Sequence, residues 1–337
     1  MARSSLQASV AEAWYGRPGW LWILLPVEWV FIALVRVRRW CYSAGWLSVW
    51  RSPIPVIIVG NIVAGGSGKT PLVLALTKFL SEQGYRPGLV SRGYRAKVEN
   101  FPALVTPDSD AEEMGDEPLL LAQRSGCPVV IDPDRTAACK RLLELTDCDV
   151  ILADDGLQHY GLARDVEIVV VDRERGFGNG HCLPVGPLRE PISRLSSANF
   201  VLYNGDAVDT SSFALRPTAW INVADRSRRE VPENFAGSEA LALAGIGNPG
   251  RFFSSCRKLG IQVEALALSD HADIDAEFLS SARTYPNQTI LMTEKDAVKC
   301  TNFADANMWY LEVVAELNFE LTTALQQMLP VPKLRRG

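Results

Sequence analysis

The sequence has no paired-cysteine spacing and no excess of positive charge. Its seven cysteines are an odd number without a Cys-x-x-Cys pair, which fits neither a disulfide framework nor a zinc site. We therefore expect reduced thiols in the cytosol. The formal net charge of −5 argues against a nucleic-acid partner. Internal repeats and low-complexity tracts are also lacking, so the 337 residues are expected to bury one large core or two smaller ones.

The chain also lacks an unbroken hydrophobic run of bilayer-spanning length near its N-terminus. The apolar run Trp20–Val35 covers sixteen residues and is interrupted by Pro26 and Glu28, whereas a span needs about 20. Arginines follow the run directly, and seven of the nine tryptophans lie in the first fifty residues, a residue type that prefers the lipid headgroup region. We predict a membrane-associated helix; the alternative is an amphipathic helix packed on the protein's own core.

The most informative stretch that is present, Ile57–Pro71, is an apolar run that breaks into a glycine-rich turn ending in Gly-Lys-Thr. Such a turn points backbone N–H groups and a helix N-terminus at phosphate oxygens. Lys69 is expected to reach the β- and γ-phosphates and Thr70 to hold Mg²⁺. The strict motif has glycine where this chain has Val63, and a glycine-rich turn without a nucleotide is the alternative. The remaining predicted nucleotide-binding residues of the turn are Gly65, Gly66, Ser67 and Gly68.

A second motif, Asp149–His159, is a buried-strand pattern that ends in two carboxylates. A carboxylate at the end of a strand beside a phosphate loop can hold Mg²⁺, so Asp154 and Asp155 are candidate metal ligands, and Asp154 is also a candidate catalytic residue. A turn aspartate that caps the next helix is the alternative. Gln158 is a candidate nucleotide-binding residue. His159 is explained equally well by catalysis and by a neutral, hydrogen-bonded imidazole.

Three further motifs carry candidate catalytic residues. Asp116, in the segment Gly-Asp-Glu-Pro that opens an apolar helix, is either the helix N-cap or a base for an acceptor hydroxyl. Arg189 is expected to neutralise phosphate charge, and Glu190 to hold a metal or water. His271 lies just after a predicted strand, where a hinge motion could bring it to the site.

Residues 293–296 have the wrong spacing for a guanine-reading loop, so GTP is not inferred.

Apolar and β-branched runs alternate with helical patterns along the chain, which predicts an α/β fold. We expect a P-loop NTPase-type parallel sheet flanked by helices, a smaller C-terminal α/β lobe and the N-terminal membrane-associated helix. The expected strands are 57–60, 88–91, 128–132, 149–153, 166–172, 200–203, 240–246, 263–268, 289–293 and 308–314. The expected regions are an N-terminal segment (1–54), a kinase core (55–205), a linker (206–236) and the C-terminal lobe (237–337).

Taken together, these motifs resemble those of the tetraacyldisaccharide 4′-kinases, the lipid A 4′-kinases of Gram-negative bacteria. The resemblance covers almost the whole chain and rests on the order of its motifs, GNIVAGGSGKTP, SRGY, GDEP, DDGLQH, GPLREP, the Asp270–His271 pair and TEKDAVK. The displaced glycines of the phosphate loop belong to that family's version of it. One departure is Ala272, where members of the family often carry a second histidine.

The resemblance implies transfer of the γ-phosphate of ATP, with Mg²⁺, to the 4′-hydroxyl of a tetraacyldisaccharide 1-phosphate, giving lipid IV-A. It implies phosphate and metal roles for Lys69 and Thr70, and metal roles for Asp154, Asp155 and Glu190. Asp116 becomes the expected base, with His271 tuning it. The implied partners are the acylated disaccharide lipid and the cytoplasmic face of the bacterial inner membrane; no obligate protein partner is inferred. The competing classes are a soluble P-loop ATPase or GTPase switch of the metal-chaperone type, and a non-catalytic membrane-bound nucleotide sensor.

Overall fold

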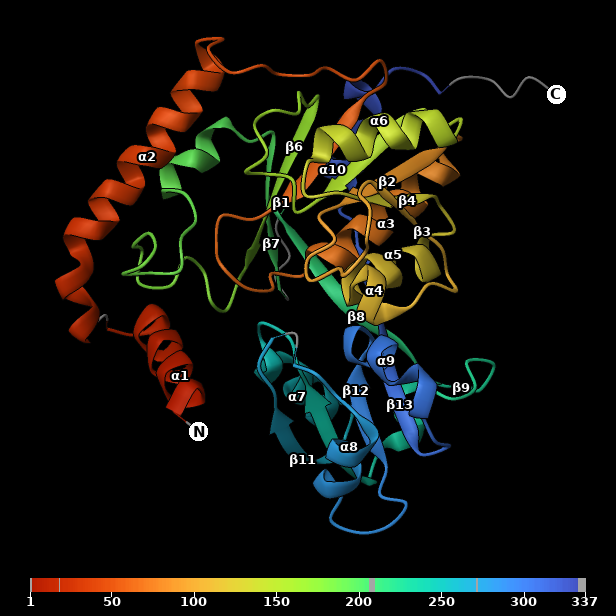
Figure 1. Ribbon diagram of the computed structural model, residues 1–337. Coiled ribbons are helices and arrows are strands. Elements are labelled where there is room, and N and C mark those ends of the chain that lie inside the picture. Colours follow the sequence, from red (N-terminus) through yellow and green to blue (C-terminus); the bar gives the residue numbers. More distant parts are fainter. Residues whose placement is uncertain (1, 18, 206–209, 271, 333–337) are drawn as a thin grey trace.

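The protein is built around one continuous mixed sheet of thirteen strands (Figure 1). The computed structural model describes residues 2–17, 19–205, 210–270 and 272–332. The strand order is β11-β10-β12-β13-β8-β7-β6-β1-β5-β2-β4-β3, with β9 paired to β8. The strands are β1 (Val56–Gly60), β2 (Pro87–Ser91), β3 (Ala103–Val105), β4 (Val129–Ile131), β5 (Val150–Asp154), β6 (Val166–Asp172), β7 (Phe200–Asn204), β8 (Ser212–Asn222), β9 (Arg229–Glu230), β10 (Glu239–Ala244), β11 (Gln262–Ala267), β12 (Ile290–Thr293) and β13 (Met308–Glu316).

Ten α-helices accompany the sheet in the part of the chain that the structure describes. They are α1 (Ala2–Tyr15), α2 (Leu25–Ser43), α3 (Lys69–Glu82), α4 (Ala111–Met114), α5 (Asp116–Ser125), α6 (Arg135–Leu145), α7 (Pro249–Lys258), α8 (Ala276–Ala282), α9 (Glu294–Cys300) and α10 (Phe319–Met328). Short 3-10 helices complete the set, η1 (Gly19–Leu24), η2 (Ile192–Ser197), η3 (Pro232–Phe235) and η4 (Thr301–Phe303).

The first half of the sheet is parallel from β7 to β4 and closes with β3 antiparallel to β4. Helices α3, α5 and α10 pack on one face, and α6 packs on the other. In the second half, α8 and α9 cover one face and α7 the other. Strands β1, β2, β4, β5 and β6 are buried along their whole length, which is why these segments read as largely apolar runs. The predicted α/β fold with a mostly parallel sheet is confirmed, and all ten expected strands are present.

The region expected to be a linker contains the longest strand of the sheet, β8. This strand pairs in parallel with β7 through its first residues and antiparallel with β13 along its length, so it joins the two halves. Proline cannot donate to a strand ladder and is confined to edges and bulges. Pro217 lies where the register between β8 and β13 shifts. Because of this irregularity, the segment lacks the regular apolar pattern by which a strand is predicted from sequence. The domain boundaries themselves stay a prediction.

The N-terminal helices lie along the flank of the first half rather than within a layer (Figure 1). By length and composition, Gly19–Ser43 is a helical segment that could cross a membrane. Most of its large apolar side chains are exposed, namely Trp20, Trp22, Ile23, Val27, Trp29, Val30, Leu34, Val37 and Trp40. Its other face packs on the protein through Leu21, Phe31 and Ile32, so membrane association of the exposed face stays a prediction.

Candidate active site

The phosphate loop connects β1 to α3, as its strand–turn–helix pattern predicts. Gly65 has φ +104° and Gly68 has φ +87°, a backbone region that favours glycine. At Gly68 a side chain is also excluded by space, because a Cβ there would lie 2.1 Å from Nδ2 of Asn204. The Asn204 amide in turn donates to the carbonyl of Ser67 at 3.0 Å. Asn204 thus braces the loop from the end of β7.

The displaced glycine of the motif has a structural explanation. Val63 forms an antiparallel bridge with Leu188, and the N–H of Ala64 donates to the carbonyl of Pro187 at 2.8 Å. The first half of the loop therefore pairs with residues 187–188 as a short ribbon, for which a β-branched residue suits better than glycine. The ribbon also fixes Arg189, whose N–H donates to the carbonyl of Ile62 at 2.7 Å.

One lysine and one arginine side chain meet on Asp155 directly after β5. Lys69 Nζ lies 3.4 Å from Asp155 Oδ1, and Arg189 Nη1 lies 3.3 Å from the same oxygen. Burial alone would raise the pKa of Asp155, but Lys69, Arg189 and Arg135 together hold that pKa well below its usual range. Asp155 is therefore an ionised carboxylate beside the phosphate loop, paired with both cations.

Asp154 occupies a different environment from its neighbour. Its side chain is 2% exposed, and its Oδ1 accepts no hydrogen bond from the residues that the structure describes. Burial, followed by the charge of Glu117, raises the pKa of Asp154 to about 7. A buried carboxylate oxygen without a partner fits a hard cation such as Mg²⁺, which prefers oxygen ligands and keeps several waters. Over residues 2–17, 19–205, 210–270 and 272–332, no cluster of three or more His, Cys, Asp or Glu side chains could hold a metal alone.

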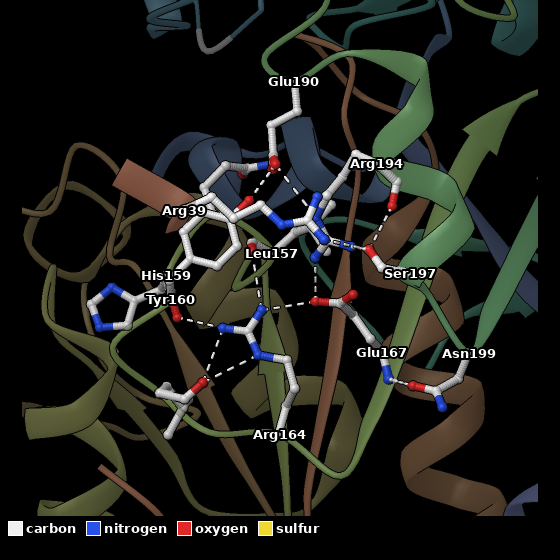
Figure 2. Close-up of polar contacts among 12 residues, drawn as sticks. Arg39, Leu157, His159, Tyr160, Arg164, Glu167, Glu190, Arg194, Ser197 and Asn199 are labelled. Carbon is white, nitrogen blue, oxygen red and sulfur yellow. Dashed lines mark hydrogen bonds and ion pairs between the residues drawn. The ribbon is translucent and has the colours of Figure 1, made fainter. Parts of the chain in front are cut away.

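Glu190 and Gln158 lie behind the loop and contact each other. Gln158 Nε2 donates to the carbonyl of Asn61 and to Glu190 Oε1, both at 3.0 Å. Figure 2 shows the rest of this network, in which the Tyr160 hydroxyl and Arg194 reach Glu190, and Arg194 and Arg164 share Glu167. In this arrangement the Glu190 carboxylate is already hydrogen-bonded, so a metal role for it stays a prediction.

His159 contacts the residue that caps α6. Its Nε2 lies 3.1 Å from Oδ1 of that residue, Asp134. Burial and the charge of Arg135 lower the pKa of His159, although Asp134 opposes them. These contacts agree with the hydrogen-bonded, neutral imidazole considered above.

Asp116 is the first residue of α5 and not its N-cap. The N-cap is Gly115, with φ +89°, and no side chain among the described residues caps the helix. The Asp116 carboxylate accepts the N–H of Glu117 at 3.0 Å and is 7% exposed. Lys299 Nζ lies 3.6 Å from its Oδ2. Asp116 is therefore not the N-cap residue, although its carboxylate accepts one first-turn N–H of the helix. His271, the other residue expected on this side, lies outside the described residues.

A cavity of about 230 Å³ joins the phosphate loop to the C-terminal half. Lys69 and Thr70 line it from one side, Phe252, Ser255 and Leu311 from the other, and Glu117 and Lys295 at one end. The loop 245–248 before α7 approaches the phosphate loop so closely that a Cβ at Gly247 would lie 2.2 Å from the backbone nitrogen of Gly66.

Sequence reasoning missed two residues of this cavity and one beside the carboxylates. Asn248 donates to Asp172 at 3.3 Å, and Arg251 donates to the carbonyl of Asn204. Arg135 is buried beneath the carboxylates and donates to the carbonyl of Asp155 at 3.0 Å. The glycine-rich turn after β10, which repeats the strand–turn–helix pattern of the phosphate loop, is the signal that could have pointed to the second side of the cavity.

Comparisons with known proteins agree with this geometry. The family model LpxK, described as tetraacyldisaccharide-1-P 4′-kinase, matches residues 20–330. The chain is similar to the tetraacyldisaccharide 4′-kinase of Nitrosococcus oceani, with 44% identity over 96% of each chain. It is 48% identical to that of Pseudomonas syringae pv. syringae over 90% of this chain and 92% of the relative. A crystal structure of LpxK from Aquifex aeolicus in complex with ATP has a TM-score of 0.75 and 27% identity, covering 92% of this chain and 99% of that one.

Proposed function

The chain belongs to the tetraacyldisaccharide-1-P 4′-kinase family, and we propose how its own residues carry out the reaction. The enzyme transfers the γ-phosphate of ATP to the 4′-hydroxyl of a tetraacyldisaccharide 1-phosphate, giving lipid IV-A. Neither a metal-chaperone switch nor a nucleotide sensor is favoured by this membership. The observation that carries the residue roles is the convergence of Lys69 and Arg189 on Asp155 at the phosphate loop.

The triphosphate of ATP binds at the loop formed by Gly65, Gly66, Ser67 and Gly68, where backbone N–H groups and the start of α3 favour negative charge. Lys69 and Arg189 neutralise Asp155 in the nucleotide-free protein, and they turn to phosphate oxygens when the nucleotide binds. The apolar residues Phe252 and Leu311 give the same cavity a surface suited to a base and ribose. Gln158 supports this site by holding the backbone of Asn61 in place.

Mg²⁺ supplies charge neutralisation at the transferring phosphate. Thr70, Asp154 and Asp155 would hold it: Asp154 offers a buried carboxylate oxygen without a partner among the described residues, and Asp155 is ionised. Glu190 stays a candidate for assisting this site.

Asp116 accepts the proton of the 4′-hydroxyl. It is not the N-cap residue of α5, it is buried, and its neighbour Glu117 lines the same cavity as Lys69 and Thr70. A base at this point removes the hydroxyl proton as the oxygen attacks phosphorus, while Arg189 stabilises the charge on the transferring phosphate. His271 is proposed to tune Asp116.

We further propose that α2 seats the enzyme on the cytoplasmic face of the bacterial inner membrane. Glu28, the acidic residue of this apolar helix, is 4% exposed and turns toward the protein, where it accepts the N–H of Cys182 at 2.6 Å and lies 3.0 Å from His181 Nδ1. The exposed apolar side chains of Gly19–Ser43 therefore face outward and can enter the lipid. Arg36, Arg38 and Arg39 each add about 1 kcal/mol of attraction to anionic lipid near the surface.

Product analysis tests the proposal. Radiolabelled ATP and the acyl disaccharide should give a labelled lipid on thin-layer chromatography, and Asp116→Asn should lower kcat by about 10²–10⁴-fold with near-normal ATP affinity. Release of inorganic phosphate alone would favour the switch, and no turnover at all would favour the sensor. An Asp116→Asn enzyme that works at the wild-type rate would place the base elsewhere.

A further inference from the structure

Two lysines of α9 contact the two carboxylates that open α5. Lys295 Nζ lies 2.8 Å from Glu117 Oε1, and Lys299 Nζ lies 3.6 Å from Asp116 Oδ2. The two lysines are four residues apart, so they share one face of the helix. Both belong to the TEKDAVK motif. The roles proposed above for nucleotide binding at the phosphate loop assign no function to these two lysines.

Each lysine also reaches the segment that follows β11. Lys295 Nζ lies 3.0 Å from Asp270 Oδ1, and Lys299 Nζ donates to the carbonyl of Ala272 at 3.2 Å. Each lysine of the pair therefore joins one acidic residue of α5 to either Asp270 or Ala272. Both lysine side chains are largely buried, with 13% and 14% exposure.

Helix α9 is itself fixed firmly to the C-terminal half of the sheet. Asp296, between the two lysines, has no exposed surface, and it accepts the N–H of Gly245 and the hydroxyl of Thr293. A Cβ at Gly245 would lie 2.8 Å from Asp296 Oδ1, so the helix and the end of β10 are in close contact. The lysines consequently project from a rigid base across the junction between the two halves.

The charges around Lys295 favour its cationic form. Burial would lower the pKa of Lys295, but Glu117, Asp116 and Asp270 raise it above its ordinary value. A lysine that stays charged holds carboxylates by ion pairing and by donating hydrogen bonds, and it takes no part in proton transfer itself.

We propose that Lys295 and Lys299 are positioning residues for phosphate transfer, which hold Asp116 and Glu117 of α5 against Asp270 and Ala272 beside the cavity. We call this pair the lysine clamp. This inference rests on the proposed function, because it gives the clamp the task of holding the base against the acceptor hydroxyl. Misplacing a reacting group by about 1 Å can cost about 10²-fold in rate.

The same interface contains an ion pair that serves as a matched control. Arg124 of α5 contacts Glu294 of α9 and lies 3.3 Å from Glu312 of β13, so it also joins the two halves. Its ion pairs within the described part of the chain involve these two glutamates and not the acidic pair at 116–117. Arg124→Met should therefore weaken the interface and lower the melting temperature while kcat stays near the wild-type value.

The test compares steady-state kinetics and melting of full-length variants. Lys295→Met and Lys299→Met should each lower kcat by about 10²-fold, with the KM for ATP within about threefold of wild type, and Lys295→Arg should recover most of the rate. If the lysines only hold the interface together, they will behave like Arg124→Met, with a lower melting temperature and a normal kcat, and the proposal is overturned.

A double variant separates this inference from the proposed function. If Lys299 acts through Asp116, then Lys299→Met should cause little further loss of kcat in an Asp116→Asn background, because both changes affect one step. Fully multiplicative losses would refute the clamp and leave Asp116 as the base. A wild-type rate for Asp116→Asn alone would instead refute the base, whatever the lysine variants do.

Discussion

Replacing Asp154 by asparagine should stabilise the metal-free protein while abolishing phosphate transfer. The carboxylate is 2% exposed, and its Oδ1 has no hydrogen-bond partner in the part of the chain that the structure describes. Burial, and then the neighbouring charge of Glu117, raise its pKa from 3.8 to about 7. The folded protein therefore carries a cost whenever this group is ionised.

The size and the pH dependence of the effect follow from that shift. A rise of about three pKa units corresponds to about 4 kcal/mol, since one unit is worth about 1.4 kcal/mol. Below about pH 4 the carboxyl is protonated in both the folded and the unfolded chain and costs nothing. Between about pH 4 and 7 the unfolded chain loses the proton first, so the wild type loses stability as the pH rises, and above about pH 7 the cost is constant.

Chemical unfolding in the presence of a chelator, at pH 5 and pH 8, measures the effect. Asp154→Asn should raise the free energy of unfolding, by more at pH 8 than at pH 5 and by at most about 4 kcal/mol, because the amide also needs partners. Asp149, just before the same strand, is the matched control. It is buried but accepts the N–H of Arg86 at 2.7 Å, so Asp149→Asn should destabilise by about 1–3 kcal/mol. An Asp154→Asn variant that is less stable than wild type at pH 8 would refute the reasoning.

Lys69→Ala should abolish transfer with little change in melting temperature, because Lys69 lines the nucleotide cavity and Arg189 still pairs with Asp155. Near-normal turnover in the radiolabel assay would contradict a phosphate-binding role for Lys69. Glu28→Ala should lower stability by about 1–3 kcal/mol and raise the KM for the lipid while ATP affinity is kept, because the N–H of Cys182 loses its acceptor; an unchanged lipid KM would show that α2 docking does not matter for the substrate. Deleting residues 1–39 should keep ATP binding but remove sedimentation with anionic vesicles at low salt, and a full-length protein that stays in the supernatant would contradict the membrane proposal.

The sequence by itself determined the parts of the site that are local. Strand β1, the glycine-rich turn and α3 follow one another without a gap, so their geometry is encoded within one short stretch of chain. The carboxylates Asp154 and Asp155 could be placed because the strand before them is a pure apolar run whose end is visible in the sequence. Ligands bind beyond the carboxyl ends of parallel strands, and this rule alone is enough to join the two motifs into one site.

Only the tertiary structure decided the features that depend on distant residues. Asp116 could be a cap or a base on local grounds; the structure places Gly115 at the cap position and Lys299 beside the carboxylate, and the role as base stays a prediction. Lys295 and Glu117 are 178 positions apart, and no periodicity links them. Glu28 looked like an expensive charge in an apolar helix, yet it faces a loop from residue 181 onward. Local patterns record which face of an element is apolar, whereas the partners of a buried charge are set by how the elements pack.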